Sequence, residues 1–122
     1  MSKTIVTVDD AATMRKLIAF TLRGAGYEVL EASDGVAGLQ LLSSRAADLI
    51  ITDINMPGMG GIELTRSVRQ LAQHKTTPIL VVTTESEAGV KAQAKAVGAN
   101  GWIVKPFQPD QLVDIVKRVL KS

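Results

Sequence analysis

The residues that decide the fold are Leu49-Ile50-Ile51-Thr52-Asp53, an apolar run that ends in a carboxylate. The run does not alternate between apolar and polar side chains, so both faces of the strand that it predicts are expected to be buried. Such a strand is typical of a parallel sheet that has helices on both faces. We therefore expect residues 49–51 to form a central strand of an α/β fold, with Asp53 just beyond its carboxyl end.

Four further segments predict strands of the same sheet. Residues 5–8, 79–82 and 103–104 are apolar and β-branched, whereas residues 27–32 alternate between apolar and polar positions, as expected for an edge strand. Segments with helical spacing separate these strands. The spacing is clear at positions 14, 17, 18, 21 and 22 and at positions 112, 115, 116, 119 and 120, and weaker around positions 39–46, 64–71 and 90–97.

Capping residues support the expected helix ends. They are Asp34 and Ser86 as N-caps, Pro109 in a first turn, and Gly24, Gly26 and Gly98 as helix stops. A strand followed by a helix, five times over, predicts right-handed crossovers and a doubly wound five-stranded parallel sheet. We expect one domain over residues 1–122.

Composition narrows the classes of function. None of the 122 residues is a cysteine, which excludes disulfides, Cys-bound zinc, iron–sulfur clusters and thiol nucleophiles. Aromatic residues are only 3% and the net charge is only +2, which disfavours a nucleic-acid binder. The apolar run at residues 5–8 is too short for a signal peptide or a membrane span, so we expect a cytoplasmic protein.

Polar side chains follow the predicted strands at their carboxyl ends, where doubly wound sheets bind ligands. Asp9 and Asp10 follow the first strand, Asp53 the third, Thr83 the fourth and Lys105 the fifth. Three carboxylates in a small volume repel one another, so a cation or a proton must neutralise them. Oxygen ligands without a calcium-type loop favour Mg²⁺, with Mn²⁺ as the alternative. With a divalent ion and the lysine, the formal charges sum to zero, so the site can accept a phosphoryl anion.

The sequence resembles a response-regulator receiver domain over essentially the whole chain, closest to the single-domain chemotaxis type. The matching positions are Asp9-Asp10, Thr13-Met14-Arg15, Asp53 with Asn55-Met56-Pro57, Thr83, and Lys105-Pro106-Phe107. The resemblance implies a flavodoxin-like sheet with strand order 2-1-3-4-5. It also implies a cis peptide bond between Lys105 and Pro106.

The resemblance implies that Asp53 is the phosphoacceptor. Its carboxylate would attack the phosphorus of a phosphohistidine on a histidine kinase, or of a small phosphodonor, and form an acyl phosphate. Asp10, Asp53 and the backbone carbonyl of Asn55 would bind Mg²⁺ directly. Asp9 would act largely through water.

The resemblance also implies how the site switches. Lys105 would pair with one phosphoryl oxygen, and the Thr83 hydroxyl would move to bind another. Trp102, at the aromatic position of the fifth strand, would turn inward, or else it is simply a packed, partly exposed edge-strand side chain. Asn55 and Glu85 would modulate the lifetime of the acyl phosphate, or else Glu85 is a solvated charge at the start of the fourth helix.

Two residues depart from the family's usual pattern, and the single histidine lies outside it. Gly60 replaces the family's usual aspartate, so the third helix is expected to lack a capping oxygen. Thr84 replaces a smaller residue and is expected to narrow access to the site. His74, the only histidine, lies in a polar segment and is expected at the surface.

We expect a single receiver domain without an output domain, so the implied function is signalling through protein contact. The chain would catalyse only its own phosphorylation and dephosphorylation. Its expected partners are a histidine kinase, a phosphatase and a target such as a flagellar motor switch protein, with the chain itself monomeric and binding neither membrane nor nucleic acid. The target would meet the fourth helix, fifth strand and fifth helix, whose basic residues are Lys91, Lys95, Lys117, Arg118 and Lys121.

Other functions remain in view. A phosphorelay shuttle or phosphate sink between histidine-containing proteins would use the same site. An aspartyl-phosphate phosphatase is more remote, because Asn55 places an amide where that chemistry needs a second acid. A flavodoxin-like electron carrier is disfavoured because Asp9 and Asp10 would repel a flavin phosphate.

Overall fold

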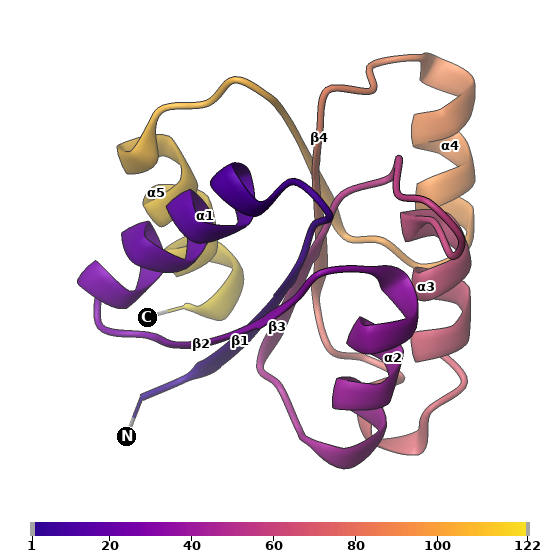
Figure 1. Ribbon diagram of the computed structural model, residues 1–122, viewed down its shortest axis with the longest axis horizontal. Helices are drawn as coiled ribbons and strands as arrows, with labels where there is room; N and C mark the ends of the chain where they lie inside the picture. Colours follow the sequence, from indigo (N-terminus) through magenta and orange to yellow (C-terminus); the bar gives the residue numbers. More distant parts are fainter. Residues whose placement is uncertain (1, 122) are drawn as a thin grey trace.

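The computed structural model describes residues 2–121, which fold as strands that alternate with helices (Figure 1). The elements are β1 (Thr4–Val8), α1 (Ala12–Gly24), β2 (Glu28–Ala32), α2 (Gly35–Ser44), β3 (Leu49–Thr52), α3 (Gly61–Val68), the 3₁₀ helix η1 (Ala72–His74), β4 (Ile79–Thr83), α4 (Ala88–Ala96), β5 (Gly101–Val104) and α5 (Pro109–Leu120). Within the described part of the chain, no helix has the length and hydropathy needed to cross a membrane.

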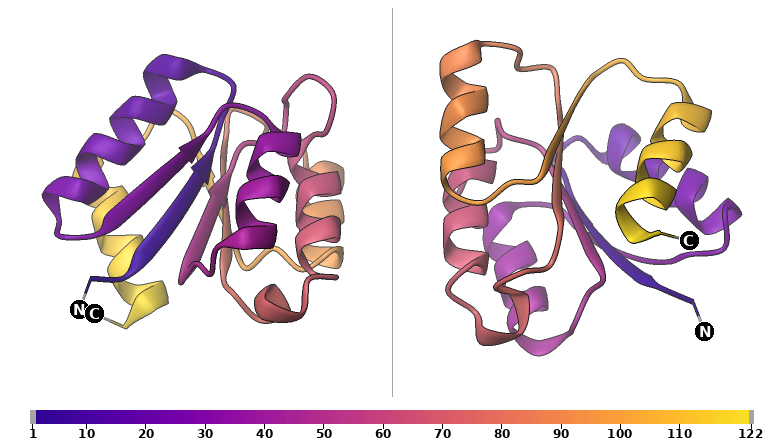
Figure 2. Two further views of the ribbon diagram at one scale, coloured as in Figure 1. Left: turned by 60° about the horizontal axis from the view of Figure 1, so that its bottom comes forward. Right: turned by 180° about the vertical axis from the view of Figure 1, so that it is seen from behind.

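The five strands form one parallel sheet in the order β2-β1-β3-β4-β5, which confirms the expected topology. Helices α1 and α5 cover one face, and α2, α3 and α4 cover the other (Figures 1 and 2). Each face therefore has its own apolar core. Ile18 and Leu112 belong to the first core, and Leu42 and Leu64 to the second.

Burial along the strands agrees with the patterns in the sequence. Every residue of β3 and β4 is buried, as their uninterrupted apolar runs predict. Strand β2 is an edge strand, as predicted, but its exposure alternates only at its start, because Leu30 and Glu31 are both half-buried. Strand β5 begins at Gly101, two residues before the predicted start, because its backbone pairs with Leu80, whose side chain fills the space that a Cβ would need.

Several predicted helix ends are confirmed. The Asp34 carboxylate accepts a hydrogen bond from Ala37 N–H at 2.8 Å and caps α2. Pro109 is the first residue of α5. Gly26 and Gly98 follow α1 and α4 with φ values of 99° and 109°, which few other residues adopt.

The N-cap residues of α4 and α3 make no side-chain hydrogen bond to their helices. Ser86 was predicted to cap α4, but this is wrong: Glu87 is the N-cap and makes no side-chain cap hydrogen bond. Instead, the Glu85 carboxylate accepts a hydrogen bond from Glu87 N–H at 3.2 Å. For α3 the expectation is confirmed, since its N-cap Gly60 offers no capping side chain.

The prediction that His74 lies at the surface is wrong, because the side chain is fully buried. Its Nε2 lies 3.1 Å from both Leu42 O and Arg45 O, and its Nδ1 lies 3.0 Å from the Thr77 hydroxyl. The last carbonyls of a helix lack partners within the helix. The imidazole N–H of His74 supplies a hydrogen-bond donor to such carbonyls at the end of α2. His74 therefore ties the segment before β4 to that helix.

Candidate functional site

Three carboxylates meet at the carboxyl edge of the sheet. Asp9 and Asp10 follow β1 and Asp53 follows β3, and each offers an oxygen within 4.8 Å of the others. Asp9 is 1% exposed, Asp53 is half-buried and Asp10 is exposed. A cluster of hard oxygen ligands with one open side suits Mg²⁺, which keeps part of its water shell. The residues present therefore fit the predicted metal.

The sheet itself brings these carboxylates together. Strands β1 and β3 are neighbours with Val8 opposite Thr52, and Asp53 N–H continues their pairing by donating to Val8 O at 3.1 Å. Asp9, just beyond β1, likewise donates its backbone N–H to the O of Ala32, the last residue of β2, at 3.2 Å. The backbones of Asp9 and Asp53 are thus held by extensions of the parallel ladder.

Lys105 reaches the carboxylates from the end of β5. Its Nζ lies 2.9 Å from Asp9 Oδ2 and 3.0 Å from Asp53 Oδ2, and the side chain is 8% exposed. The backbone N–H of Lys105 donates to Thr83 O at 2.8 Å. The peptide bond between Lys105 and Pro106 is cis, as the resemblance implied.

Opposing effects act on the Lys105 ammonium. Burial lowers its pKa, but the hydrogen bonds and negative charges of Asp9 and Asp53 outweigh burial, so the pKa is raised above its usual value. Lys105 therefore stays charged at neutral pH. Three carboxylates and one ammonium leave a formal charge of −2, which one divalent cation neutralises.

The Asp53 side chain has a fixed orientation. Its Oδ1 accepts a hydrogen bond from Ile54 N–H at 2.7 Å while Oδ2 faces Lys105, and the Thr52 hydroxyl donates to Asp53 O at 2.8 Å. The first turn of α3 packs directly against this backbone, since a Cβ on Gly61 would overlap Asp53 O. The role of Gly61 was not predicted, although the pair Gly60-Gly61 signals a close approach of two backbones.

Thr83 and Glu85 lie on the same edge, where β4 leads into α4. Thr83 is fully buried, and its hydroxyl accepts a hydrogen bond from Glu85 N–H at 3.2 Å. Glu85 is half-buried, so it is not the fully solvated charge of the alternative expectation, and its carboxylate accepts a hydrogen bond from Glu87 N–H just before α4. Asn55, two residues after Asp53, and Thr84, directly after Thr83, are both exposed.

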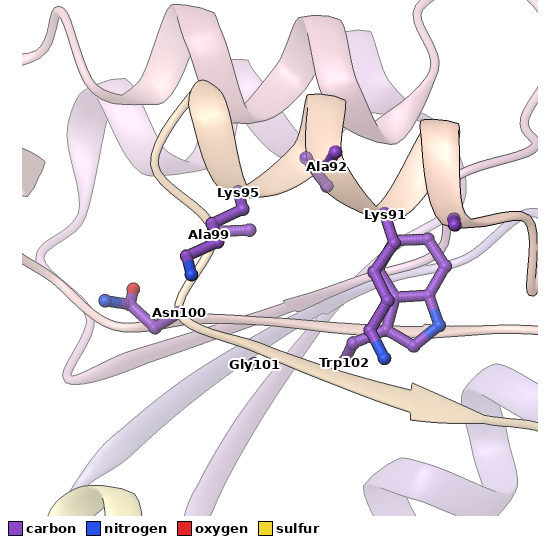
Figure 3. Close-up of a pocket in the computed structure, with 9 residues that line it drawn as sticks. Lys91, Ala92, Lys95, Ala99, Asn100, Gly101 and Trp102 are labelled. Carbon is purple, nitrogen blue, oxygen red and sulfur yellow. The ribbon is translucent and has the colours of Figure 1, made fainter.

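A groove of about 390 Å³ lies between α4 and β5 (Figure 3). Trp102 and Lys91 lie at one end of it, and Asn100 and Lys95 lie toward the other. Trp102 is half-buried and packs against the cluster that contains Val81, which fits the alternative of a packed edge-strand aromatic. Among the described residues, its indole N–H has no hydrogen-bond partner although it is buried.

Residues 5–117 match the family model described as the response regulator receiver domain. Chemotaxis protein CheY of Pseudomonas aeruginosa is 40% identical over 118 residues, which are 96% of this chain and 95% of that protein. The phosphate regulon transcriptional regulatory protein PhoB of the same organism is also 40% identical, over 99% of this chain but 53% of PhoB. Identity alone therefore does not separate chemotaxis proteins from transcriptional regulators.

Solved structures share the fold, and one of them is described with a bound metal ion. Chemotaxis protein CheY4 of Vibrio cholerae superposes with a TM-score of 0.94 at 44% identity, over 98% of this chain and 99% of that one. The receiver domain of the sensor histidine kinase PA1611 from Pseudomonas aeruginosa superposes with a TM-score of 0.91 at 26% identity, over the full length of both chains. The PA1611 structure is described with a magnesium ion coordinated in its active-site cleft.

Proposed function

Because the chain belongs to the response-regulator receiver family, we propose that it takes a phosphoryl group from a histidine kinase onto Asp53 in a Mg²⁺-dependent reaction. The observation that carries the proposal is the convergence of Asp53 with Lys105 and the acidic pair Asp9-Asp10. The chain catalyses only its own phosphorylation and dephosphorylation, and it acts in the cytoplasm as a monomer.

The chemistry needs a positioned nucleophile and neutralised charge. A carboxylate oxygen of Asp53 forms a bond to phosphorus while the bond from phosphorus to the kinase's imidazole nitrogen breaks, and the imidazole leaves with that electron pair. Lys105 offsets the charge of the phosphoryl oxygens. Asp10, Asp53 and the Asn55 carbonyl would hold Mg²⁺, with Asp9 acting largely through water. The metal supplies further neutralisation of the phosphoryl oxygens.

Mass spectrometry of the intact protein tests this proposal. With a small phosphodonor and Mg²⁺, we expect one labile phosphoryl adduct per chain, and we expect none when a chelator is present. Asp53→Asn should abolish the adduct, whereas Asp48→Asn, which changes an exposed aspartate outside the cluster, should leave it unchanged. Undiminished labelling of Asp53→Asn would refute Asp53 as phosphoacceptor. Turnover of the donor without any adduct would favour the phosphatase alternative.

We infer that phosphorylation controls the face formed by α4, β5 and α5. The phosphoryl group brings as many as two negative charges to the site beside Thr83. Thr83 in turn lies opposite Val104 of β5 and is bonded to Glu85, just before α4. Trp102 borders the groove on this face, so its fluorescence should change with Mg²⁺ and beryllofluoride. An unchanged spectrum would count against a moving Trp102.

The proposed target is an acidic protein surface, most plainly a flagellar motor switch protein. The basic side chains Lys91 and Lys95 line the groove and favour such a partner, and the full-length match to a CheY protein supports the chemotaxis role. Pull-down with and without beryllofluoride tests this. Activated chain that captures a motor switch protein would support it, and capture of histidine-containing phosphotransfer proteins instead would favour a phosphorelay shuttle.

A further inference from the structure

Arg15 contacts the acidic loop from α1, although sequence reasoning gave it no role of its own. One guanidinium nitrogen donates to the backbone carbonyl of Asp9 at 2.8 Å. The same guanidinium pairs with Glu31 of β2 through Nε at 3.3 Å. The Arg15 and Glu31 side chains are only 13% and 20% exposed, so this contact is largely shielded from water. Arg15 therefore links the end of β1 to β2.

Asp9 is consequently held at every polar atom that it has. Its N–H donates to Ala32 O, its carbonyl accepts from Arg15, its Oδ1 accepts from Ala11 N–H at 2.9 Å, and its Oδ2 accepts from Lys105. Three of these contacts come from the strand ends or from the loop itself. Arg15 provides the one that comes from the body of α1. Without Arg15, the carbonyl of the peptide between Asp9 and Asp10 loses this hydrogen bond.

We propose that Arg15 is a positioning residue of the metal site, which fixes the Asp9–Asp10 peptide so that both carboxylates face Asp53. This inference rests on the metal site of the proposed function. Arg15 does not act as a ligand, since a guanidinium has no lone pair to offer a cation. It acts through geometry, as residues that orient metal ligands commonly do.

Charge and geometry predict opposite results when Arg15 is removed. Loss of a cation beside three carboxylates strengthens their attraction for Mg²⁺, whereas loss of the contact to Asp9 O frees the loop and weakens Mg²⁺ binding. The sign of the change therefore separates a positioning role from a purely electrostatic one. Arg15→Lys adds a second comparison, because lysine keeps the charge but cannot reach both Asp9 O and Glu31 with a planar fork.

The chain offers a matched control in Arg23, which also pairs with Glu31, at 3.4 Å. Arg23 also donates a hydrogen bond to Val29 O at 2.8 Å. The hydrogen bond to the Asp9 carbonyl, by contrast, comes from Arg15. Arg23→Met thus removes a cation and a Glu31 contact from the same helix without touching the acidic loop. A loss of Mg²⁺ affinity that follows only from disturbing the α1–β2 contact would appear in this variant as well.

Isothermal titration calorimetry with Mg²⁺ alone tests the proposal on the full chain. We expect Arg15→Met to weaken Mg²⁺ binding by roughly tenfold, Arg15→Lys to weaken it by less, and Arg23→Met to leave it unchanged. Circular dichroism in chelator should show all variants folded; Arg15→Lys carries the test if Arg15→Met does not fold.

Three results would overturn the positioning role: Mg²⁺ binding by Arg15→Met as tight as in the parent chain or tighter, an equal loss in Arg23→Met, or no Mg²⁺ binding by the parent chain. Failure of the proposed phosphorylation alone looks different, because Mg²⁺ would then bind and respond to these variants while no phosphoryl adduct forms on Asp53; a parent chain that binds no Mg²⁺ would contradict both proposals.

Discussion

At the scale of single residues, Thr7 has a buried hydroxyl that makes no hydrogen bond to any described residue. The side chain is fully buried in β1, and within residues 2–121 its Oγ1 has no partner. A buried hydroxyl without a hydrogen bond costs free energy, which an apolar group of similar shape would recover. Thr65 is its natural counterpart, since it is equally buried but donates to Gly61 O at 2.7 Å.

Thr7→Val should therefore raise the free energy of unfolding by about 1 kcal/mol, because it removes an unpaired polar group. Thr65→Val should lower the same quantity by about 1 kcal/mol, because it removes a made hydrogen bond. Urea denaturation of both variants measures the two changes. A destabilised Thr7→Val protein would show that the hydroxyl has a partner after all.

Lys105 should make stability depend on pH at the alkaline end. The pKa of its ammonium is raised in the folded chain by Asp9 and Asp53, against the lowering effect of burial. A raised pKa contributes stability that is complete below the unfolded value of about 10.4 and is lost as the pH rises through the folded value. In chelator, the unfolding free energy of the parent chain should therefore fall more steeply above about pH 10 than that of Lys105→Met. Parallel curves would contradict the ion pairs.

At the scale of elements, Arg69 joins the end of α3 to two loops. Its guanidinium donates to His74 O at 2.8 Å, to Gly98 O at 2.7 Å and to the Asn100 side chain at 3.0 Å. Burial lowers the pKa of Arg69, but an arginine remains charged at neutral pH. The Asn100 side chain also accepts from Ile79 N–H, so these bonds hold the start of β4 and the connection from α4 to β5 together.

Arg69→Met should loosen the amino end of the sheet and leave the metal site intact. We expect faster amide exchange at residues 97–101 and a loss of about 2 kcal/mol in unfolding free energy, since several carbonyls lose a charged donor. Mg²⁺ affinity should not change, because the acidic cluster lies at the carboxyl end of the strands. Arg66→Met, which changes an exposed arginine of α3, is the control. Unaltered exchange at residues 97–101 would contradict the role given to Arg69.

At the scale of the whole molecule, the sheet could be predicted because burial on both faces leaves a local pattern. The runs at residues 49–51 and 79–82 carry no polar alternation, and both strands are buried throughout. The meeting of Asp9, Asp10 and Asp53 followed from the same inference, since the carboxyl ends of all strands in a parallel sheet lie at one edge. The roles of these residues, by contrast, came from the family resemblance.

Contacts between segments far apart in the chain could not be predicted in the same way. His74 lies among polar neighbours in the sequence and was predicted at the surface, yet both partners of its Nε2 lie about thirty residues earlier, at the end of α2. Arg15 and Arg69 were likewise not assigned their backbone partners. Such contacts depend on which helix ends and loops come together, and hydrophobic periodicity does not record that arrangement.

Among the three clustered carboxylates, Asp53 is the one that we propose receives the phosphoryl group. Borohydride tests it directly in the unmodified chain, because hydride reduces an acyl phosphate to an alcohol, releases phosphate and so marks the phosphorylated aspartate as homoserine. Peptide sequencing by mass spectrometry after treatment with a phosphodonor should find homoserine at position 53 alone, and only when Mg²⁺ is present. Homoserine at position 9 or 10, or none at all, would contradict the claim.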